Sequence, residues 1–201
     1  MAAKRQTKSK SKRKAWYPVH APALFGEKEV GETYLFAPEN GLGRCMRVNM
    51  RNLTGSMRDQ SVYITLAVNK LEGNQLHTLI KEYTLDSGYV KRMVRKNSSR
   101  VDVVHSFKTK DDKEILVKGL ILTYGKSPRS TGVQLRNKLV EELTTLISAA
   151  EFNELVNNVI GKKIQSDLKK VLNSVQCFPN RSLLLRVLMS HQKSGPDTHK
   201  A

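Results

Sequence analysis

The spacing of apolar residues changes once along the chain, and this change restricts the possible fold more than any other feature. Before Tyr124, apolar residues often alternate with more polar ones, as from Val62 to Val68, which is typical of half-buried strands. After Tyr124 they recur three and four positions apart, as from Leu135 to Ile147, which is typical of amphipathic helices. A block of strands followed by a block of helices predicts an α+β fold.

Turn residues divide the first block into hairpins. Glu72-Gly73-Asn74 separates one pair of apolar runs, and residues 110–113 separate a second pair. Strands are expected at residues 42–50, 62–68, 76–85, 101–109, 114–124 and 182–189. Helices are expected at residues 135–147, 152–160 and 164–175, with Gly161 as a helix C-cap. A short helix capped by Asp86 or Ser87 is expected between the two hairpins.

The domain boundaries follow composition. Residues 1–14 form a basic tail that is expected to be disordered when free, and residues 15–41 an extended strap broken by prolines. Residues 42–190 are expected to form a single α+β globular domain, followed by a polar tail at 191–201. The apolar residues expected to anchor the strap are Trp16, Tyr17, Leu24 and Phe25. For Trp16 two interpretations stand, a stacking platform for a base or a buried anchor, and the anchor is favoured.

Net charge indicates the kind of partner. The chain has 35 Lys and Arg against 18 Asp and Glu, a formal charge of +17, and seven of these cations lie in the first fourteen residues. Such a surplus is the electrostatic footprint of nucleic-acid binding. A membrane partner is not expected, because no apolar run approaches the roughly 18 residues of a spanning helix. Cys45 and Cys177 form no C-x-x-C motif, so we expect two buried thiols in a cytosolic protein.

The segment YVKRMVRKN is the strongest candidate for phosphate contact within the folded part. On a continuous helix, its basic residues fall in one sector and Val90, Met93 and Val94 fall opposite. Its basic residues are Lys91, Arg92, Arg95 and Lys96. The alternative is an ordinary solvated helix face, but no acidic residue lies among these cations to temper their repulsion. The segment therefore predicts a phosphate-binding face.

The segment GKSPRSTG, residues 125–132, follows a strand and precedes a helix, which raises the possibility of a nucleotide-binding loop. Five residues rather than four separate Gly119 from Gly125, so the spacing does not fit that motif. We expect instead a loop that presents Lys126 and Arg129, with Arg136 and Lys138 on the following helix. The histidines show no metal-ligand spacing, and no nucleophile elbow occurs. No enzyme activity, cofactor or metal is therefore expected.

Several ordered blocks of the chain resemble the archaeal and eukaryotic small-subunit ribosomal protein family S3Ae, also called eS1. The blocks are WYPVHAPALFGEKEVGET, PENGLGR, NLTGS, YVKRMVRKNSSRVDVV and IGKKIQSDLKK, spread from Trp16 to Lys170. The short termini look archaeal. The resemblance implies a β-barrel-like body with helices packed beside it, in agreement with the α+β prediction. It also matches the family's basic N-terminal extension to Lys4–Lys14 and its basic helix to Tyr89–Lys96.

The resemblance implies a structural constituent of the cytoplasmic small ribosomal subunit, which supports translation. Its partners would be ribosomal RNA on the platform near the 3′ end of that RNA and the messenger exit, neighbouring platform proteins, and messenger RNA near the exit. Two alternatives remain at this point: a free RNA- or DNA-binding regulator, and a nucleotide-binding enzyme built on GKSPRSTG. The expected RNA-binding residues are Lys4, Arg5, Lys8, Lys10, Lys12, Arg13, Lys14, Arg44, Lys91, Arg92, Arg95, Lys96, Arg100, Lys126, Arg129, Arg136, Lys162 and Lys163.

Overall fold

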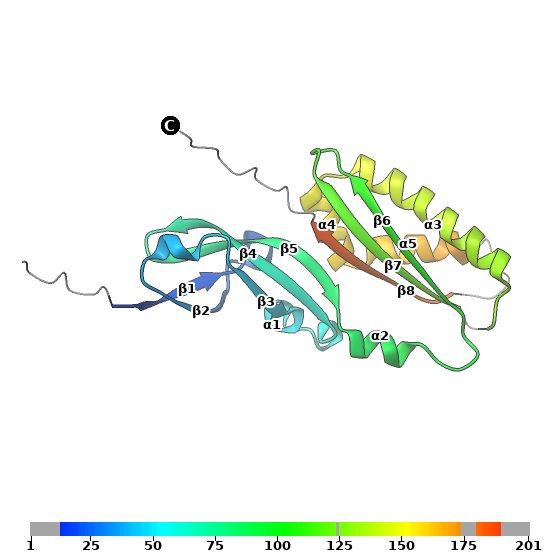
Figure 1. Cartoon of the computed structure of the whole chain (residues 1–201), viewed down its shortest axis with the longest axis horizontal. Coiled ribbons are helices and arrows are strands. Elements are labelled where there is room, and N and C mark those ends of the chain that lie inside the picture. The colour runs from blue at the N-terminus through cyan, green and yellow to red at the C-terminus, as the bar shows by residue number, and fades with distance from the viewer. Residues whose placement is uncertain (1–12, 124, 174–179, 190–201) are drawn as a thin grey trace, which may run out of the picture.

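A computed structural model describes residues 13–123, 125–173 and 180–189 (Figure 1). The strands are β1 (Ala15–His20), β2 (Glu29–Leu35), β3 (Cys45–Asn49), β4 (Val62–Glu72), β5 (Gln75–Leu85), β6 (Arg100–Lys108), β7 (Glu114–Thr123) and β8 (Asn180–Met189). The helices are α1 (Met50–Thr54), α2 (Ser87–Met93), α3 (Arg129–Ala149), α4 (Phe152–Ile160) and α5 (Lys163–Asn173). The predicted α+β class is confirmed, with strands predominating before residue 124 and helices after it.

The eight strands form one sheet, whose main order is β2-β1-β5-β8-β7-β6. Strands β1–β5 make up its first half and strands β6–β8 its second half, and β5 joins the two. Along one edge, β5 pairs antiparallel with β4, which in turn pairs with β3. Along its other edge, β5 pairs first with β1, in parallel at Leu76 and His77. Further along it pairs with β8, antiparallel at Glu82 and Tyr83. Each half of the sheet is therefore built out from the same central strand.

The first half curls so that β2 and β3, the two strands at its ends, approach each other. The Arg44 guanidinium donates a hydrogen bond of 2.9 Å to the Thr33 hydroxyl of β2. The Met46 side chain lies over Gly31, where an added Cβ would be 3.7 Å from its sulfur atom. These side-chain contacts bring the two edge strands, β2 and β3, close together. The described residues of β2 and β3 form no backbone pairing with each other, so this half is barrel-like but not closed by hydrogen bonds.

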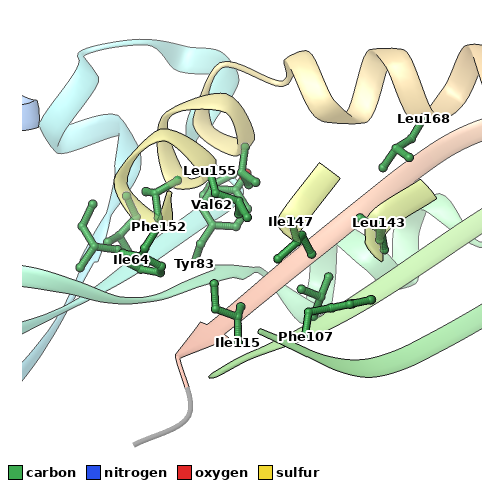
Figure 2. Packing of buried hydrophobic residues seen from close by; sticks show 14 of the residues in the cluster. Val62, Ile64, Tyr83, Phe107, Ile115, Leu143, Ile147, Phe152, Leu155 and Leu168 are labelled. Atoms are coloured by element: carbon green, nitrogen blue, oxygen red, sulfur yellow. The ribbon is translucent and has the colours of Figure 1, made fainter. Parts of the chain in front are cut away.

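In the second half, helices α3, α4 and α5 cover one face of the sheet (Figure 1). The three-and-four spacing in α3 buries Leu135, Leu139, Leu143 and Ile147 at 3% exposure or less. Figure 2 shows Leu143 and Ile147 near Phe107 and Ile115 of the sheet. The amphipathic pattern thus directs the helix stripe toward the strands, and burial of each such side chain contributes about 1.5–3 kcal/mol.

A single apolar cluster extends across both halves. Phe152 and Leu155 of α4 belong to the same cluster as Ile64 of β4 and Tyr83 of β5, and Figure 2 shows these four side chains gathered at the junction. Because α4 packs on strands of the first half, the helical layer holds the two parts of the sheet together.

The sequence predictions differ from the structure at several local points. The strand expected at 42–50 begins at Cys45, and Met50 already starts α1, a helix that was not predicted. Helix α4 does end at Gly161, but Gly161 is right-handed, and the left-handed residue is Lys162, with φ 58°. Cys45 is exposed, so its expected burial is wrong; Cys177 lies outside the described residues.

The segment expected to be an extended strap carries β1 and β2, which pair antiparallel as a two-stranded ribbon. Two of its four expected anchors bury part of their surface against the apolar clusters, namely Tyr17 and Phe25. Leu24 is 40% exposed and Trp16 is 63% exposed. The interpretation of Trp16 as a buried anchor is therefore wrong.

Candidate nucleic-acid interface

Helix α2 is about two turns long, and a side chain caps its N-terminus. The Asp86 carboxylate accepts a hydrogen bond of 3.2 Å from the Tyr89 amide, as the sequence predicted for an N-cap. At the other end the Val94 amide donates to the Val90 carbonyl, and the helix stops at Met93. Lys91 and Arg92 therefore lie in the last turn, where the helix dipole favours positive charge.

Arg95 and Lys96 lie beyond the end of α2, in a turn. The Ser98 hydroxyl donates to the Arg95 carbonyl at 2.6 Å, and Asn97 takes a left-handed conformation with φ 68°. The expectation that four cations share one helix face is therefore wrong in its geometry, because only two are helical. All four side chains are nevertheless exposed.

A hydrogen-bonded junction joins this turn to the segment that precedes α3. The Ser127 amide donates to the Ser99 hydroxyl at 2.9 Å. The Thr123 hydroxyl accepts from the Ser99 amide at 3.1 Å and donates to the Gly125 carbonyl at 2.7 Å. Thr123 is fully buried, whereas Ser99, Gly125 and Ser127 are partly exposed, so these bonds are partly shielded from water. The junction places residues 95–100 beside residues 125–129, although about 28 positions separate them in sequence.

Three chain segments thereby contribute exposed cations to one region, which we call the basic surface. Its members are Lys91, Arg92, Arg95, Lys96, Arg100, Lys126 and Arg129, all exposed. Between Asp86 and Asp102 the sequence has no carboxylate. Within the described ranges, the ion pair recorded for these seven is that of Arg100 with Asp102, at 2.9 Å between half-exposed groups. The surface thus carries a large excess of positive charge.

A groove runs beside this surface, between α2 and strands β6 and β7. Lys91 and Arg100 lie along it, as does Lys118 of β7, with Val90 and Val104 among the apolar lining. Asp102, the ion-pair partner of Arg100, also lines the groove. The sequence predictions omitted Lys118. The signal that could have identified it is its position as the one cation in the otherwise apolar stretch ILVKGLILT.

The segment GKSPRSTG does not form a phosphate cradle. Such a cradle needs several backbone N–H groups free to face the ligand. Here the Ser127 amide is already bonded to Ser99, and Pro128, which has no N–H group, occupies the N-cap position of α3. In the described part of the chain, no cluster of His, Cys, Asp and Glu is suited to hold a metal.

The remaining predicted residues lie away from the basic surface or outside the described ranges. Arg136 lines a separate hollow between β6 and α3, together with Asp102 and Glu141. Arg44 contacts Thr33 in the first half. Arg13, Lys14 and Lys163 are exposed at other places. The predicted tail residues outside the described ranges are Lys4, Arg5, Lys8, Lys10 and Lys12.

Lys162 has a structural partner that the sequence did not reveal. Its ammonium group lies 3.1 Å from the Asp59 carboxylate, 103 positions away in the chain. The Asp59 side chain is only 15% exposed. The pair ties the α4–α5 turn to the first half of the molecule, so Lys162 is partly engaged within the fold.

Tyr83 is the group whose ionisation the fold shifts most clearly. Burial raises the pKa of Tyr83 to about 12; the nearby Asp59 carboxylate adds to this, and a hydrogen bond with Gln165 opposes it. The side chain is 4% exposed and lies in the core between the two halves. Tyr83 therefore contributes to core packing, and its hydroxyl is not available to a ligand at the surface.

Comparison with known proteins places these features in a family. The model of the Ribosomal S3Ae family matches residues 2–186. The chain is 31% identical over 188 residues to small ribosomal subunit protein eS1 of Methanothermobacter thermautotrophicus, covering 90% of this chain and 96% of that one. It is 32% identical over 168 residues to the protein of the same name from Sulfurisphaera tokodaii, covering 84% and 87%.

Proposed function

The chain belongs to the Ribosomal S3Ae family, and on this premise we propose that it binds ribosomal RNA through the basic surface as part of the small subunit. Members of this family are structural ribosomal proteins, so the chain is a non-enzymatic structural protein that supports translation. The nucleotide-binding enzyme considered from GKSPRSTG is thereby set aside.

One observation carries the RNA-binding proposal: seven exposed cations from three segments share one surface that has a single carboxylate partner in the described ranges. Like charges at such density repel one another and weaken the fold, which a polyanion would relieve. Phosphates of RNA would release bound counterions as these cations neutralise them, so binding would weaken as salt increases. RNA helices are recognised mainly by shape and backbone, so few contacts to base edges are expected there.

The groove beside α2 supports a particular mode of contact. Lys91, Arg100 and Lys118 line the groove. Helix α2 has only about two turns, so its own face offers less length for an RNA strand than the groove does. We propose that one strand of RNA backbone follows this groove, with Arg95, Lys96, Lys126 and Arg129 reaching the phosphates beyond its end. The junction between Ser99 and Ser127 would keep the two loops at a fixed separation.

We propose that the basic tail at residues 1–14 makes further contacts with RNA phosphates. Its seven cations have no carboxylate among them in sequence, so RNA phosphates would be their natural counterions. We propose that the tail threads between RNA helices while residues 42–190, together with β1 and β2 of the strap that pair into the same sheet, act as one folded domain. The other predicted contacts, Arg44, Arg136, Lys162 and Lys163, belong to the same proposal as secondary sites.

The location within the subunit is part of the proposal as well. We propose, in line with the family resemblance, that the chain lies in the cytoplasmic ribosome, on the platform near the 3′ end of the small-subunit RNA and the messenger exit. Neighbouring platform proteins and messenger RNA would then be further partners. Across the described residues, no helix has the length and apolar character needed to span a membrane.

Sedimentation of cell extracts tests the proposal against a free RNA- or DNA-binding regulator. The tagged chain should co-migrate with the small subunit at low salt and stay with it after washing at moderate salt. Nuclease treatment of the subunits should release it. A chain found mainly at the top of the gradient, apart from subunits, would contradict the proposed function.

A further inference from the structure

The ribbon formed by β1 and β2 carries large apolar or aromatic side chains on both faces, and folding accounts for only one of these sets. Side chains alternate between the faces of a strand. Val19 and Leu35 point to one side, where they form a buried cluster with Val68 and Leu76. An exposed ribbon packed on one face should carry polar side chains on the other.

The other face carries three exposed aromatic rings instead. Trp16 and Tyr34 are directly opposite in the strand register, and their ring centroids are 4.9 Å apart with planes inclined by 37°. Phe36 follows two residues after Tyr34. The exposed fractions of Trp16, Tyr34 and Phe36 are 63%, 46% and 53%. We call these three residues the aromatic platform; contiguous exposed apolar surface of this kind marks an interaction site.

A cation belongs to the platform. The Lys14 ammonium group lies 4.7 Å from the centroid of the Phe36 ring and 5.7 Å from that of Tyr34. Lys14 is also the last of the seven cations that open the chain, so the platform directly follows the most basic segment of the sequence. Glu32 is a carboxylate on the same face; it pairs in register with Pro18, two positions beyond the Trp16–Tyr34 pair and on the side away from Lys14.

We propose that the aromatic platform stacks the bases of unpaired nucleotides in RNA, while the exposed Arg13 and Lys14 hold the adjoining phosphates. Flat rings beside a positive groove or tail are the combination that binds single-stranded nucleic acid, because every base has a stacking face. An apolar protein partner would leave the charge of Lys14 and Arg13 without a counterpart. This inference rests on the proposed function, since both require RNA.

The platform is separate from the basic surface. In Figure 1, β1 and β2 lie at the opposite end of the molecule from the start of α3. The two sites would therefore contact different parts of the RNA: backbone phosphates at the basic surface and exposed bases at the platform.

Fluorescence provides a direct test, because Trp16 is the only tryptophan in the chain. The full chain is titrated with a short oligouridylate and, in parallel, with an abasic ribose-phosphate oligomer of the same length. Stacking predicts that the oligouridylate quenches Trp16 emission and binds about tenfold or more tightly than the abasic oligomer. The abasic oligomer should still bind through its phosphates but leave the emission nearly unchanged.

Two variants, Tyr34→Ala and Phe36→Ala, should lower affinity for oligouridylate toward that of the abasic oligomer, with abasic binding unchanged. Met57→Ala removes another exposed apolar side chain, 63% exposed, that lies outside the platform and serves as the control. Photocrosslinking of wild-type protein to 5-bromouridine RNA, mapped by mass spectrometry, should label Trp16, Tyr34 or Phe36. This measurement needs no substitution, so it is independent of any effect of the variants on folding.

The outcomes separate the two proposals. Equal affinity for both oligomers, with no quenching and no crosslink on the platform, would overturn base stacking while leaving phosphate binding intact. Failure of both oligomers to bind at low salt would overturn the proposed function, and the stacking inference with it.

Discussion

The backbone amide of Ser127 donates a hydrogen bond of 2.9 Å to the side chain of Ser99. This bond, with those of Thr123, joins the turn that carries Arg95 and Lys96 to the segment that carries Lys126 and Arg129. Cations from separate parts of the sequence thus share one surface because of a small, partly buried polar network.

Removing cations from the basic surface should reduce the salt dependence of RNA binding. In Arg95→Ala/Lys96→Ala, the slope of log affinity against log salt should fall by up to about 2, because each lost phosphate contact contributes about 0.9 or less. The measurement is filter binding to small-subunit RNA over a salt series.

The matched control is Lys108→Ala/Lys110→Ala, which removes the same charge from the other end of the β6–β7 hairpin. Lys108 lies about 26 Å along the strand from Arg100, given a rise of about 3.3 Å per residue, and Lys110 lies in the hairpin turn that follows; both are exposed. Equal losses in both double variants would show that net charge, and not this surface, determines binding.

Breaking the junction should weaken RNA binding although no cation is removed. Thr123→Val leaves the Ser99 amide and the Gly125 carbonyl without this hydroxyl, which should lower the free energy of unfolding by about 1–3 kcal/mol. Affinity for RNA should fall several-fold because the two loops lose their fixed separation. Urea unfolding and filter binding provide the two measurements.

Thr144→Val is the control for the junction, because the Thr144 hydroxyl is exposed and bonds only within α3, to the Val140 carbonyl in the described structure. It should change neither quantity appreciably. A Thr123→Val protein with lower stability but full RNA affinity would contradict the idea that the junction positions the cations.

The neighbouring residues Lys162 and Lys163 should respond differently to substitution. Lys162→Ala removes the ion pair with Asp59 and should lower the free energy of unfolding by up to about 1 kcal/mol, since the pair is partly exposed. Lys163→Ala should leave stability nearly unchanged, because that side chain is exposed. Urea unfolding of both variants checks this; equal stability of the two would refute a structural role for the Lys162 pair.

Stability should fall at high pH in a way that depends on Tyr83. Its pKa is about 12 in the folded state against 10.0 for the ordinary group. A raised pKa means that the folded state holds the proton more tightly. The contribution is therefore complete below pH 10 and is lost as pH rises through about 12. The loss should reach roughly 2–3 kcal/mol, at about 1.4 kcal/mol per pKa unit.

Tyr83→Phe isolates this effect from the titration of lysines, which both proteins share. The variant should be less stable at neutral pH by about 1 kcal/mol for the lost hydrogen bond, yet decline less steeply between pH 10 and 12. Parallel curves for the two proteins over this interval would argue against a burial effect at Tyr83.

Strong periodicity made most of the fold predictable. The β4–β5 and β6–β7 hairpins and the three helices of the second half follow their apolar patterns, and Asp86 caps α2 as expected. The end of α2 was missed because the sequence stays favourable for a helix, whereas the turn around Asn97 interrupts it.

The candidate site was only partly predictable for a different reason. The exposed cations could be recognised from charge alone, but the contact of Ser99 with Ser127 joins residues 28 positions apart and has no local signal. Trp16 was misjudged because aromatic residues are usually buried, and only the strand register reveals that it lies on the outer face.

The most direct test of RNA binding at the basic surface is lysine acylation of intact small subunits, read by mass spectrometry. We expect Lys91, Lys96 and Lys126 to be labelled several-fold less than Lys108 and Lys110, and ribonuclease digestion to restore their labelling. Equal labelling of all five lysines in intact subunits would contradict RNA binding at this surface.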